Sequence, residues 1–391
     1  MLLQTASILL TLSWVTTCNA ATTSRTTRRS YDMPLTRDPN YGFLGNISIG
    51  SPPQRITSFI DWTWTSQYVI STTCDGNTTD TASCLSPSQP IYNQSLSSTY
   101  SNRSKTYPSD SWYPNEFFPA PFNVDYASDI ETIGPVSKRV VIQTSNFEPV
   151  IFKNFLFPFA GIFGLMPSLP GSDASSQAPF YQQYLAGAWP LPYTAFTLCP
   201  AVSCPPGASA IQTIGGYNHA LASKGLTWYN VVPVPLVNEL DFTFRPGIFS
   251  YWSISLTGLS IGNKKQVLNS TMDGGPAAIF DHASRGRGVP LSANAYANLV
   301  LVTNATLLSP DSPALVDPPN NGGGQFYHVD CNKVKNLPSI KYTFKGSSKQ
   351  WEVTGDAYTV NKEGTCVLNV RTIGVNDFQY GNFGEVFLKG K

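Results

Sequence analysis

The chain has 391 residues, a formal net charge of +1 and only 13% charged side chains. This length is enough for two domains with a large core. The near-neutral charge lacks the basic footprint of a protein that binds nucleic acid or an anionic membrane. We therefore expect no nucleic-acid partner and no membrane partner. The 30 glycines, 31 prolines and 13% aromatic residues favour a secreted all-β protein with many tight turns.

The N-terminal residues predict export. Residues 1–20 combine a short apolar stretch, Ile8 to Val15, with small residues ending at Ala20, as in a cleaved signal peptide. An uncleaved anchor is the alternative, but the apolar stretch is short for a membrane span. Residues 21–37 are polar and are predicted to be a loose N-terminal segment. The mature protein is therefore expected to be secreted and extracellular.

The cysteines and sequons agree with export. Without Cys18, six of the seven cysteines remain, and an even number in an exported chain favours disulfides. Spacing favours three local pairs: Cys74–Cys84, Cys199–Cys204 and Cys331–Cys366. Asn-x-Ser/Thr sequons predict glycosylation at Asn46, Asn77, Asn93, Asn102, Asn269 and Asn304. No metal is expected, because there is no Cys-x-x-Cys and the chain has only three histidines.

Strand patterns dominate the chain. Residues 42–50 and 55–60 read as two strands joined by a turn at Ser51-Pro52-Pro53. Residues 105–121 are rich in proline and aromatic residues and predict a long surface loop. Residues 178–187 predict one short helix, and the helical signal is otherwise thin.

Two aspartates, Asp61 and Asp281, end short apolar runs in similar contexts. Asp61 follows Phe-Ile and Asp281 follows Ile-Phe, so each is expected where a buried strand reaches a turn. Two carboxylates held a few ångströms apart cannot both ionise, so the pair could share one proton. One aspartate would then act as a base and the other as an acid.

These aspartates lie among segments that together resemble the pepsin family of aspartic peptidases. The resemblance spans roughly residues 38–388 and is carried, in the family's order, by residues 41–61, 90–100, 122–126, 161–165, 251–254, 337–340 and 381–387. It implies an all-β, bilobal, pepsin-like fold with a cleft between lobes near residues 38–200 and 208–391. It also implies a peptide or protein substrate in that cleft, hydrolysis by Asp61 and Asp281, and no cofactor. We expect a monomer.

The resemblance also assigns roles to individual side chains. Tyr126 falls at the family's flap tyrosine, and a half-buried strand tyrosine is the alternative. Tyr68 stands where the family usually has tryptophan, and Ser284 keeps the hydroxyl near the second aspartate. The pairs Cys74–Cys84 and Cys331–Cys366 match the family's disulfide positions, whereas Cys199–Cys204 rests on its short spacing alone.

The loops around both aspartates depart from the family's Asp-Thr-Gly. They read Asp-Trp-Thr at residues 61–63 and Asp-His-Ala at residues 281–283. In the family each threonine hydroxyl bonds across to the opposite loop, and each glycine lets the backbone approach the carboxylates. Trp62 and His282 have a different reach, and Thr63 adds a Cβ where room is short. The family's serine beside the first aspartate is replaced by Trp64.

Two further departures affect the predicted function. Ala127 and Asp129 replace flap glycines, so a stiffer flap is expected. The chain stops at Lys391, where the family continues into at least one more strand. Either the gene model is truncated or the C-terminal lobe tolerates the loss. We therefore predict an aspartic endopeptidase homologue with weak or impaired hydrolysis. The alternative is an inactive pseudopeptidase that binds peptides or proteins.

Overall fold

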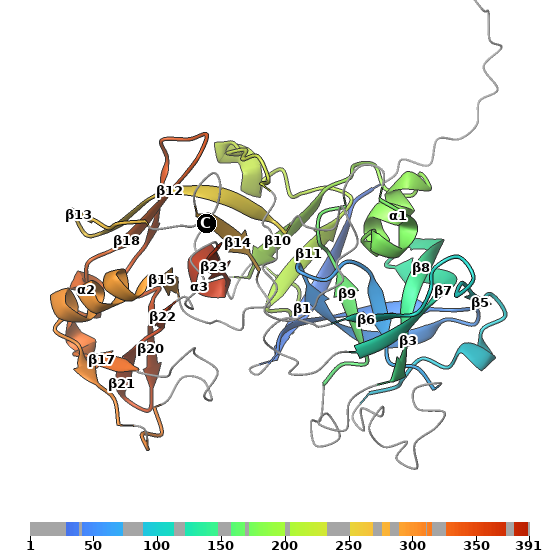
Figure 1. The fold of residues 1–391 in the computed structure, drawn as a ribbon, viewed down its shortest axis with the longest axis horizontal. Coiled ribbons are helices and arrows are strands. Elements are labelled where there is room, and N and C mark those ends of the chain that lie inside the picture. The colour runs from blue at the N-terminus through green and yellow to red at the C-terminus, as the bar shows by residue number, and fades with distance from the viewer. Residues whose placement is uncertain are drawn as a thin grey trace, which may run out of the picture.

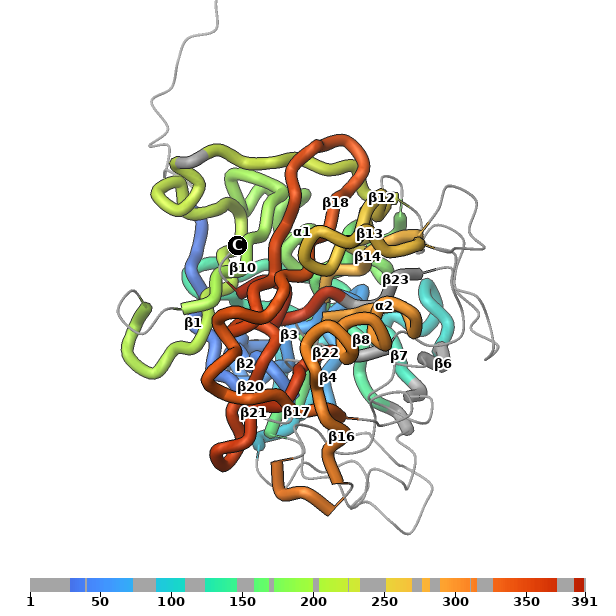
Figure 2. The backbone as a smooth tube through the Cα atoms, turned by 90° about the vertical axis from the view of Figure 1, so that its left-hand side faces the viewer, coloured from blue at the N-terminus to red at the C-terminus, as the bar shows by residue number. Residues whose placement is uncertain are grey.

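The chain folds into two β-rich lobes that lie next to each other (Figure 1). In Figure 2 the orange and red strands of the C-terminal lobe lie in front of the blue and green strands of the N-terminal lobe. The structure is a computed structural model, and it describes residues 29–38, 41–72, 89–112, 122–147, 158–168, 172–199, 204–232, 251–268, 276–281, 289–309, 311–314, 326–372 and 379–389. Several predicted residues lie outside these ranges: Cys74, Cys84, His282, Ser284, Asn77 and Asn269.

An eleven-stranded sheet builds the N-terminal lobe. Its order is β10-β11-β1-β2-β3-β9-β4-β8-β7-β5, and β6 pairs with β7. The strands are β1 (Tyr31–Asp38), β2 (Gly42–Ile49), β3 (Gln54–Asp61), β4 (Gln67–Val69), β5 (Ser101–Asn102), β6 (Asp110–Trp112), β7 (Phe122–Ile133), β8 (Val136–Phe147), β9 (Gly161–Gly164), β10 (Thr194–Leu198) and β11 (Ala210–Ile214). The predicted hairpin is confirmed, because β2 and β3 pair antiparallel across residues 51–53.

One loop prediction in this lobe is wrong, and a second is corrected in part, since residues 113–121 of the predicted surface loop lie outside the described residues. Residues 31–38 form β1, which pairs with β2 and β11, because Met33 and Leu35 are buried on one face of an alternating strand. The interpretation of residues 21–37 as loose therefore fails for this stretch. Within the predicted surface loop, residues 110–112 form β6 by pairing with β7. The local sequence did not reveal this partner strand.

Three sheets build the C-terminal lobe. The largest has the order β19-β18-β12-β14-β23, with β13 paired to β12, and the smaller two are β15-β22 and β16-β17-β21-β20. The strands are β12 (Ser253–Ile261), β13 (Lys264–Lys265), β14 (Ala277–Phe280), β15 (Val289–Leu291), β16 (Thr306–Leu307), β17 (Tyr327–Val329), β18 (Ile340–Phe344), β19 (Gln350–Val353), β20 (Thr359–Lys362), β21 (Thr365–Leu368), β22 (Val370–Thr372) and β23 (Gln379–Phe383).

Helices are few and short. The predicted helix is confirmed as α1 (Pro179–Leu185), which begins with a proline, a residue suited to the first turn. The others are α2 (Ala293–Thr303), α3 (Glu385–Leu388) and the 3₁₀ segments η2 (Gln94–Leu96), η4 (Ala174–Ser176), η5 (Leu221–Lys224) and η6 (Cys331–Asn336). The sequence did not predict α2, because it buries only Ala295 and Leu299 and so has a weak apolar stripe.

Two of the three predicted disulfides are confirmed: Cys199–Cys204 and Cys331–Cys366. The first joins the residue after β10 to the loop before β11, and the second joins η6 to β21. Each therefore ties together neighbouring segments of one lobe.

The core of the N-terminal lobe contains a buried acid, Glu131 of β7. Gln183 of α1 donates its side-chain amide to Glu131 Oε2 at 3.4 Å and accepts the indole N–H of Trp189 at 3.0 Å. Glu131 Oε1 has no hydrogen-bond partner among the described residues. Burial raises the pKa of Glu131 to about 8, and the Gln183 bond opposes part of that rise. Glu131 is therefore protonated in the folded protein at acidic pH.

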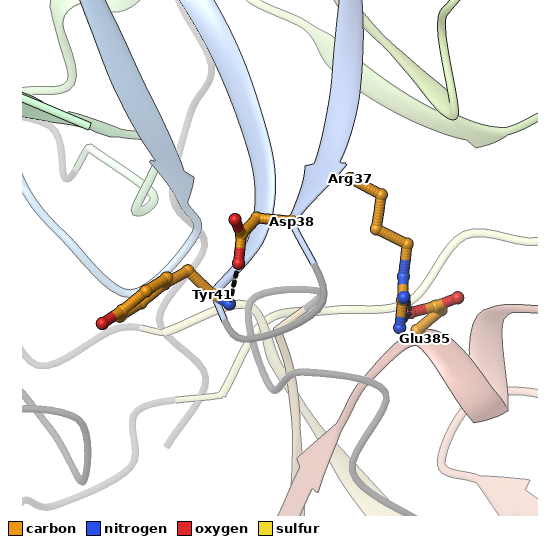
Figure 3. Close-up of polar contacts among 4 residues, drawn as sticks. All are labelled: Arg37, Asp38, Tyr41 and Glu385. Atoms are coloured by element: carbon orange, nitrogen blue, oxygen red, sulfur yellow. Dashed lines mark hydrogen bonds and ion pairs between the residues drawn. The ribbon is translucent and has the colours of Figure 1, made fainter. Parts of the chain in front are cut away.

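An ion pair joins the two lobes (Figure 3). Arg37 near the end of β1 directs Nε and Nη2 to Glu385 Oε2 at the start of α3, each at 3.0 Å. Next to it, the Asp38 side chain accepts the backbone N–H of Tyr41 at 3.0 Å. The pair fixes the first strand of the N-terminal lobe to the last helix described in the C-terminal lobe.

Breaking this pair is expected to have a small effect on stability. The Arg37 and Glu385 side chains remain 37% and 25% exposed, so water screens their attraction. We expect Glu385→Gln to lower the free energy of unfolding by at most about 1 kcal/mol, and less at high salt. Urea denaturation at two salt concentrations measures this, with Lys333→Gln, which breaks a pair within one lobe, as the control. A larger, salt-independent loss would contradict the prediction.

Candidate active site

Asp61 lies at the end of β3, against a parallel strand. In the β3–β9 register Asp61 stands beside Gly164, and its carbonyl accepts the N–H of Leu165 at 2.8 Å. Asp61 is only 4% exposed to solvent. A Cβ on Gly164 would lie 2.4 Å from the carbonyl oxygens of Trp64 and Ser66, so only glycine fits there. The apolar-apolar-Gly segment thus packs directly behind the loop of Asp61.

Asp281 has a matching place in the other lobe. It follows β14, which runs parallel to β23 with Phe280 beside Phe383. The N–H of Asp281 donates to the Phe383 carbonyl at 3.3 Å, and Asp281 is fully buried. Gly384 follows Phe383, just as Gly164 ends β9. Each lobe therefore carries an aspartate at the end of a strand, backed by a parallel strand that leads to a glycine.

Tyr251 and Trp252, which precede β12, contact the surroundings of both aspartates. Burial raises the pKa of Tyr251, and the charges of Asp61 and Asp281 each raise it further. The Trp252 carbonyl accepts the N–H of Phe280, the residue before Asp281, at 2.8 Å. The Trp252 indole N–H donates to the Leu165 carbonyl of the other lobe at 2.7 Å. Trp252 therefore links the segment behind Asp61 to the strand that ends before Asp281, and the pairing of the two carboxylates stays a prediction.

Thr63 has a role that the sequence did not predict. Its backbone N–H and its hydroxyl both donate to Asp61 Oδ1, each at 2.7 Å. Burial raises the pKa of Asp61, while the bonds from Thr63 and from the backbone of Trp64 lower it. Thr63 was expected to crowd the carboxylate, but the turn after β3 aims its hydroxyl at the carboxylate instead. Its side chain therefore stabilises the charged form of Asp61.

Removing the Thr63 hydroxyl is expected to raise the pKa of Asp61 further. In Thr63→Val the shape is kept and the hydroxyl bond that lowers this pKa is lost. If the chain cleaves peptides, the limb of its pH–rate profile that reports Asp61 should move to higher pH. Thr63→Ser keeps a hydroxyl and should retain the original profile. A Val variant in which that limb does not move would contradict this role.

Trp62 holds the first loop within its own lobe. Its indole N–H donates to Gln212 Oε1 of β11 at 3.3 Å, and its ring meets Phe196 of β10 edge-on at 5.5 Å. Gln212 is buried and donates in turn to the Ala195 carbonyl at 3.0 Å. The Asp61 loop is therefore anchored to the N-terminal sheet by this indole.

A second tryptophan connects the loop to the predicted flap strand. The Trp64 indole N–H donates to Gln143 Oε1 at 2.9 Å, and the Gln143 amide lies 3.4 Å from the Tyr126 hydroxyl. Tyr126 is buried within β7, far from the hairpin turn at Gly134. Tyr68 is also buried and meets the Trp64 ring edge-on at 6.0 Å. The flap and substrate roles of Tyr126 and Tyr68 stay predictions.

Asp129 is a structural anchor of β7. It is buried and accepts bonds from the Tyr92 hydroxyl at 2.6 Å, the Thr99 hydroxyl at 2.5 Å and the Ile130 N–H at 2.7 Å. These donors satisfy the buried carboxylate and tie the β7–β8 hairpin to residues 92–99. The glycine that the family resemblance led us to expect is thus replaced by an acid with its own set of donors.

Other predicted sites have no tested role. Asn46, Asn102 and Asn304 are exposed, and Asn93 is half-buried where its side chain caps η2. Glycosylation at these positions stays a prediction. Among the described residues, His, Cys, Asp and Glu side chains form no group of three or more that could hold a metal. Of the helices in the described ranges, none has the length and apolar character needed to span a membrane.

Two lobes with matching aspartate turns and parallel strands behind them define the pepsin-like aspartic protease class. Sequence comparison agrees. The family model described as eukaryotic aspartyl protease matches residues 42–391. The chain therefore belongs to the eukaryotic aspartyl protease family.

Fungal proteins are similar over nearly the whole chain. Aspartic protease-like protein pytH of Aspergillus terreus is 39% identical over 93% of this chain and 89% of its own length. Aspartic protease-like protein pynH of Aspergillus niger is 40% identical, with 95% and 91% covered. A probable secreted aspartic protease of Arthroderma benhamiae is 37% identical, with 92% and 88% covered. The first two relatives are named as aspartic protease-like proteins, and the third is named as a probable secreted aspartic protease.

Proposed function

We propose that this chain is a secreted aspartic endopeptidase in which Asp61 and Asp281 act as a weak catalytic pair. The observation that carries the proposal is that Trp252 is bonded next to both aspartates. Its indole N–H donates to Leu165, which itself bonds Asp61, and its carbonyl accepts the N–H of Phe280, the residue before Asp281. The burial of both aspartates and their matching strand ends add support. Relatives named as secreted proteases support the same class and location.

The chemistry follows from two buried carboxyl groups that share a proton. Burial raises the pKa of Asp61, which favours the protonated form at acidic pH. A protonated and an ionised carboxyl in one site can supply both an acid and a base. The base takes a proton from water as that water attacks the peptide carbonyl. The acid gives its proton to the carbonyl oxygen, and a second transfer releases the amine.

The proposed weakness of the Asp61–Asp281 pair follows from the position of Trp62. Its indole N–H, the one hydrogen-bond donor of this side chain, is directed to Gln212 in the same lobe. Misplacing reacting groups by about 1 Å can cost on the order of a hundredfold in rate. The same observation favours the second candidate, a pseudopeptidase that binds peptides or proteins in the cleft without cleaving them.

One experiment separates the two candidates. The purified full chain is incubated at acidic pH with a quenched peptide library, with and without a statine-type inhibitor, and inhibitor binding is measured by calorimetry. Inhibitor-sensitive cleavage supports the peptidase. Binding of the inhibitor without cleavage supports the binding module. Neither binding nor cleavage by a folded chain would refute both.

A further inference from the structure

A groove of about 670 Å³ crosses the C-terminal lobe away from the aspartates. It is lined by residues of β12, β13, β18 and β19 and of the adjoining turns, and these strands lie together at the left of Figure 1. On β18 the lining residues Lys341 and Thr343 alternate with buried Ile340 and Tyr342. The groove therefore lies on the face of the sheet opposite the core, and its volume is typical of a ligand site.

Strand register explains the shape of the groove. One row across the sheet is Gly258, Thr343 and Gln350, and the row beside it is Lys265, Ser260 and Lys341. Gly258 has no side chain, and a Cβ there would lie 3.3 Å from the Thr343 side chain. The missing side chain leaves a trough across the first row. The two lysines flank the second row.

The lining combines polar and cationic side chains with the leucines Leu259 and Leu268. It contains two lysines, seven hydroxyl or amide residues and no acid: Thr257, Ser260, Asn263, Lys265, Gln266, Lys341, Thr343, Ser348 and Gln350. Lys265 is exposed, and Lys341 has Glu352 at 3.9 Å on the edge of the groove. Because Ser260 separates the lysines, their backbones lie two strand spacings apart, roughly 10 Å. Such a surface matches a ligand with several hydroxyls and spaced negative charges.

The backbone in the floor of the groove, between β12 and β18, is already hydrogen-bonded. β12 and β18 pair with each other here, so their ladder groups are already used. A peptide that adds a strand needs an unpaired edge. A ligand that lies over this floor is therefore recognised by side-chain hydroxyls, amides and ammonium groups. We propose that this groove binds an acidic oligosaccharide, at a site separate from the aspartates.

Binding to a defined probe tests the proposal. The full chain is titrated calorimetrically with oligogalacturonate of uniform length, at a pH where its carboxylates are ionised. We expect saturable binding that weakens with added salt. Lys265→Gln should weaken it roughly threefold to fivefold through one lost surface charge. Gly258→Val should abolish it by filling the trough. Should Gly258→Val not fold, Gln350→Leu is the second variant and should weaken binding at least twofold.

Controls separate this site from general charge attraction. Lys333→Gln makes the same charge change on η6, outside the groove, and should leave binding unchanged. Neutral dextran should not bind, and poly-glutamate should bind more weakly than oligogalacturonate. Absence of saturable binding would overturn the proposal. Equal weakening by Lys333→Gln and Lys265→Gln would also overturn it. Poly-glutamate that binds as well as the sugar would assign the groove to an acidic peptide instead.

Discussion

Asp61→Asn and Asp281→Asn are each expected to lower acid-pH peptide cleavage by at least a hundredfold. Each change removes a titrating carboxyl from the pair, and general acid–base groups contribute on the order of 10²–10⁴ in rate. Asparagine keeps an oxygen that can accept the two bonds from Thr63, so Asp61→Asn should preserve the loop. The measurement is kcat on a quenched peptide, with thermal melting as the check on folding.

The double variant gives a sharper result than either single one. Residues that act as one unit are not additive, so Asp61→Asn with Asp281→Asn should be about as inactive as each single variant. Asp311→Asn, an exposed acid outside the site, is the matched control and should keep full activity. If both single variants cleave at the rate of the native chain, the assignment of Asp61 and Asp281 as catalytic residues is wrong.

The native chain is expected to lose stability between acidic and mildly alkaline pH because of Glu131. Glu131→Gln is expected to abolish most of that loss. The folded-state pKa of Glu131 is about 8, against an ordinary value of 4.5. Below the ordinary value both folded and unfolded chains hold the proton, so the protonated acid imposes no penalty. As pH rises towards 8, the unfolded chain loses the proton first and stability falls. The loss is on the order of a few kcal/mol, at about 1.4 kcal/mol per pKa unit.

The neighbours of Glu131 offer little to offset its charge. Lys138 stands opposite it on β8 without forming an ion pair, and Asp129 on the same strand is held by its own donors. On the α1 side the Gln183 amide faces it. Urea denaturation from pH 4 to pH 9 measures the effect, with Glu363→Gln, an exposed acid, as the control. A Glu131→Gln chain whose stability still falls with the native slope would contradict the prediction.

Local patterns predicted what depends on neighbours in sequence. The hairpin of β2 and β3, helix α1 and the Cys199–Cys204 pair are all formed by nearby residues. β1 escaped prediction because most of it pairs with β11, far along the chain, and β6 because its partner β7 follows only after residues 113–121. In β1 an internal proline and its polar neighbours also obscured the alternation of buried and exposed side chains. Strand pairing of this kind is decided by tertiary context more than by intrinsic preference.

The same distinction holds for the candidate site. Both aspartates could be predicted, because each ends a short apolar run. The residues that hold the first loop could not, since Gln212 and Gln143 lie 150 and 79 residues away from Trp62 and Trp64. A buried glutamine inside an apolar strand was the signal available for them. The bond from Thr63 depends on the backbone turn after β3, which residue type alone does not reveal.

Two of the contacts that join the lobes have a mechanical consequence. The Trp252 indole is bonded to Leu165, directly after β9, and Arg37 is bonded to Glu385, directly after Gly384. Both attachment points lie immediately past the strands that back the two carboxylates. A bulky ligand that pushed the lobes apart would therefore displace the strands that support both aspartates. The spacing of the acids, and with it their ability to share a proton, depends on how far an occupant opens the molecule.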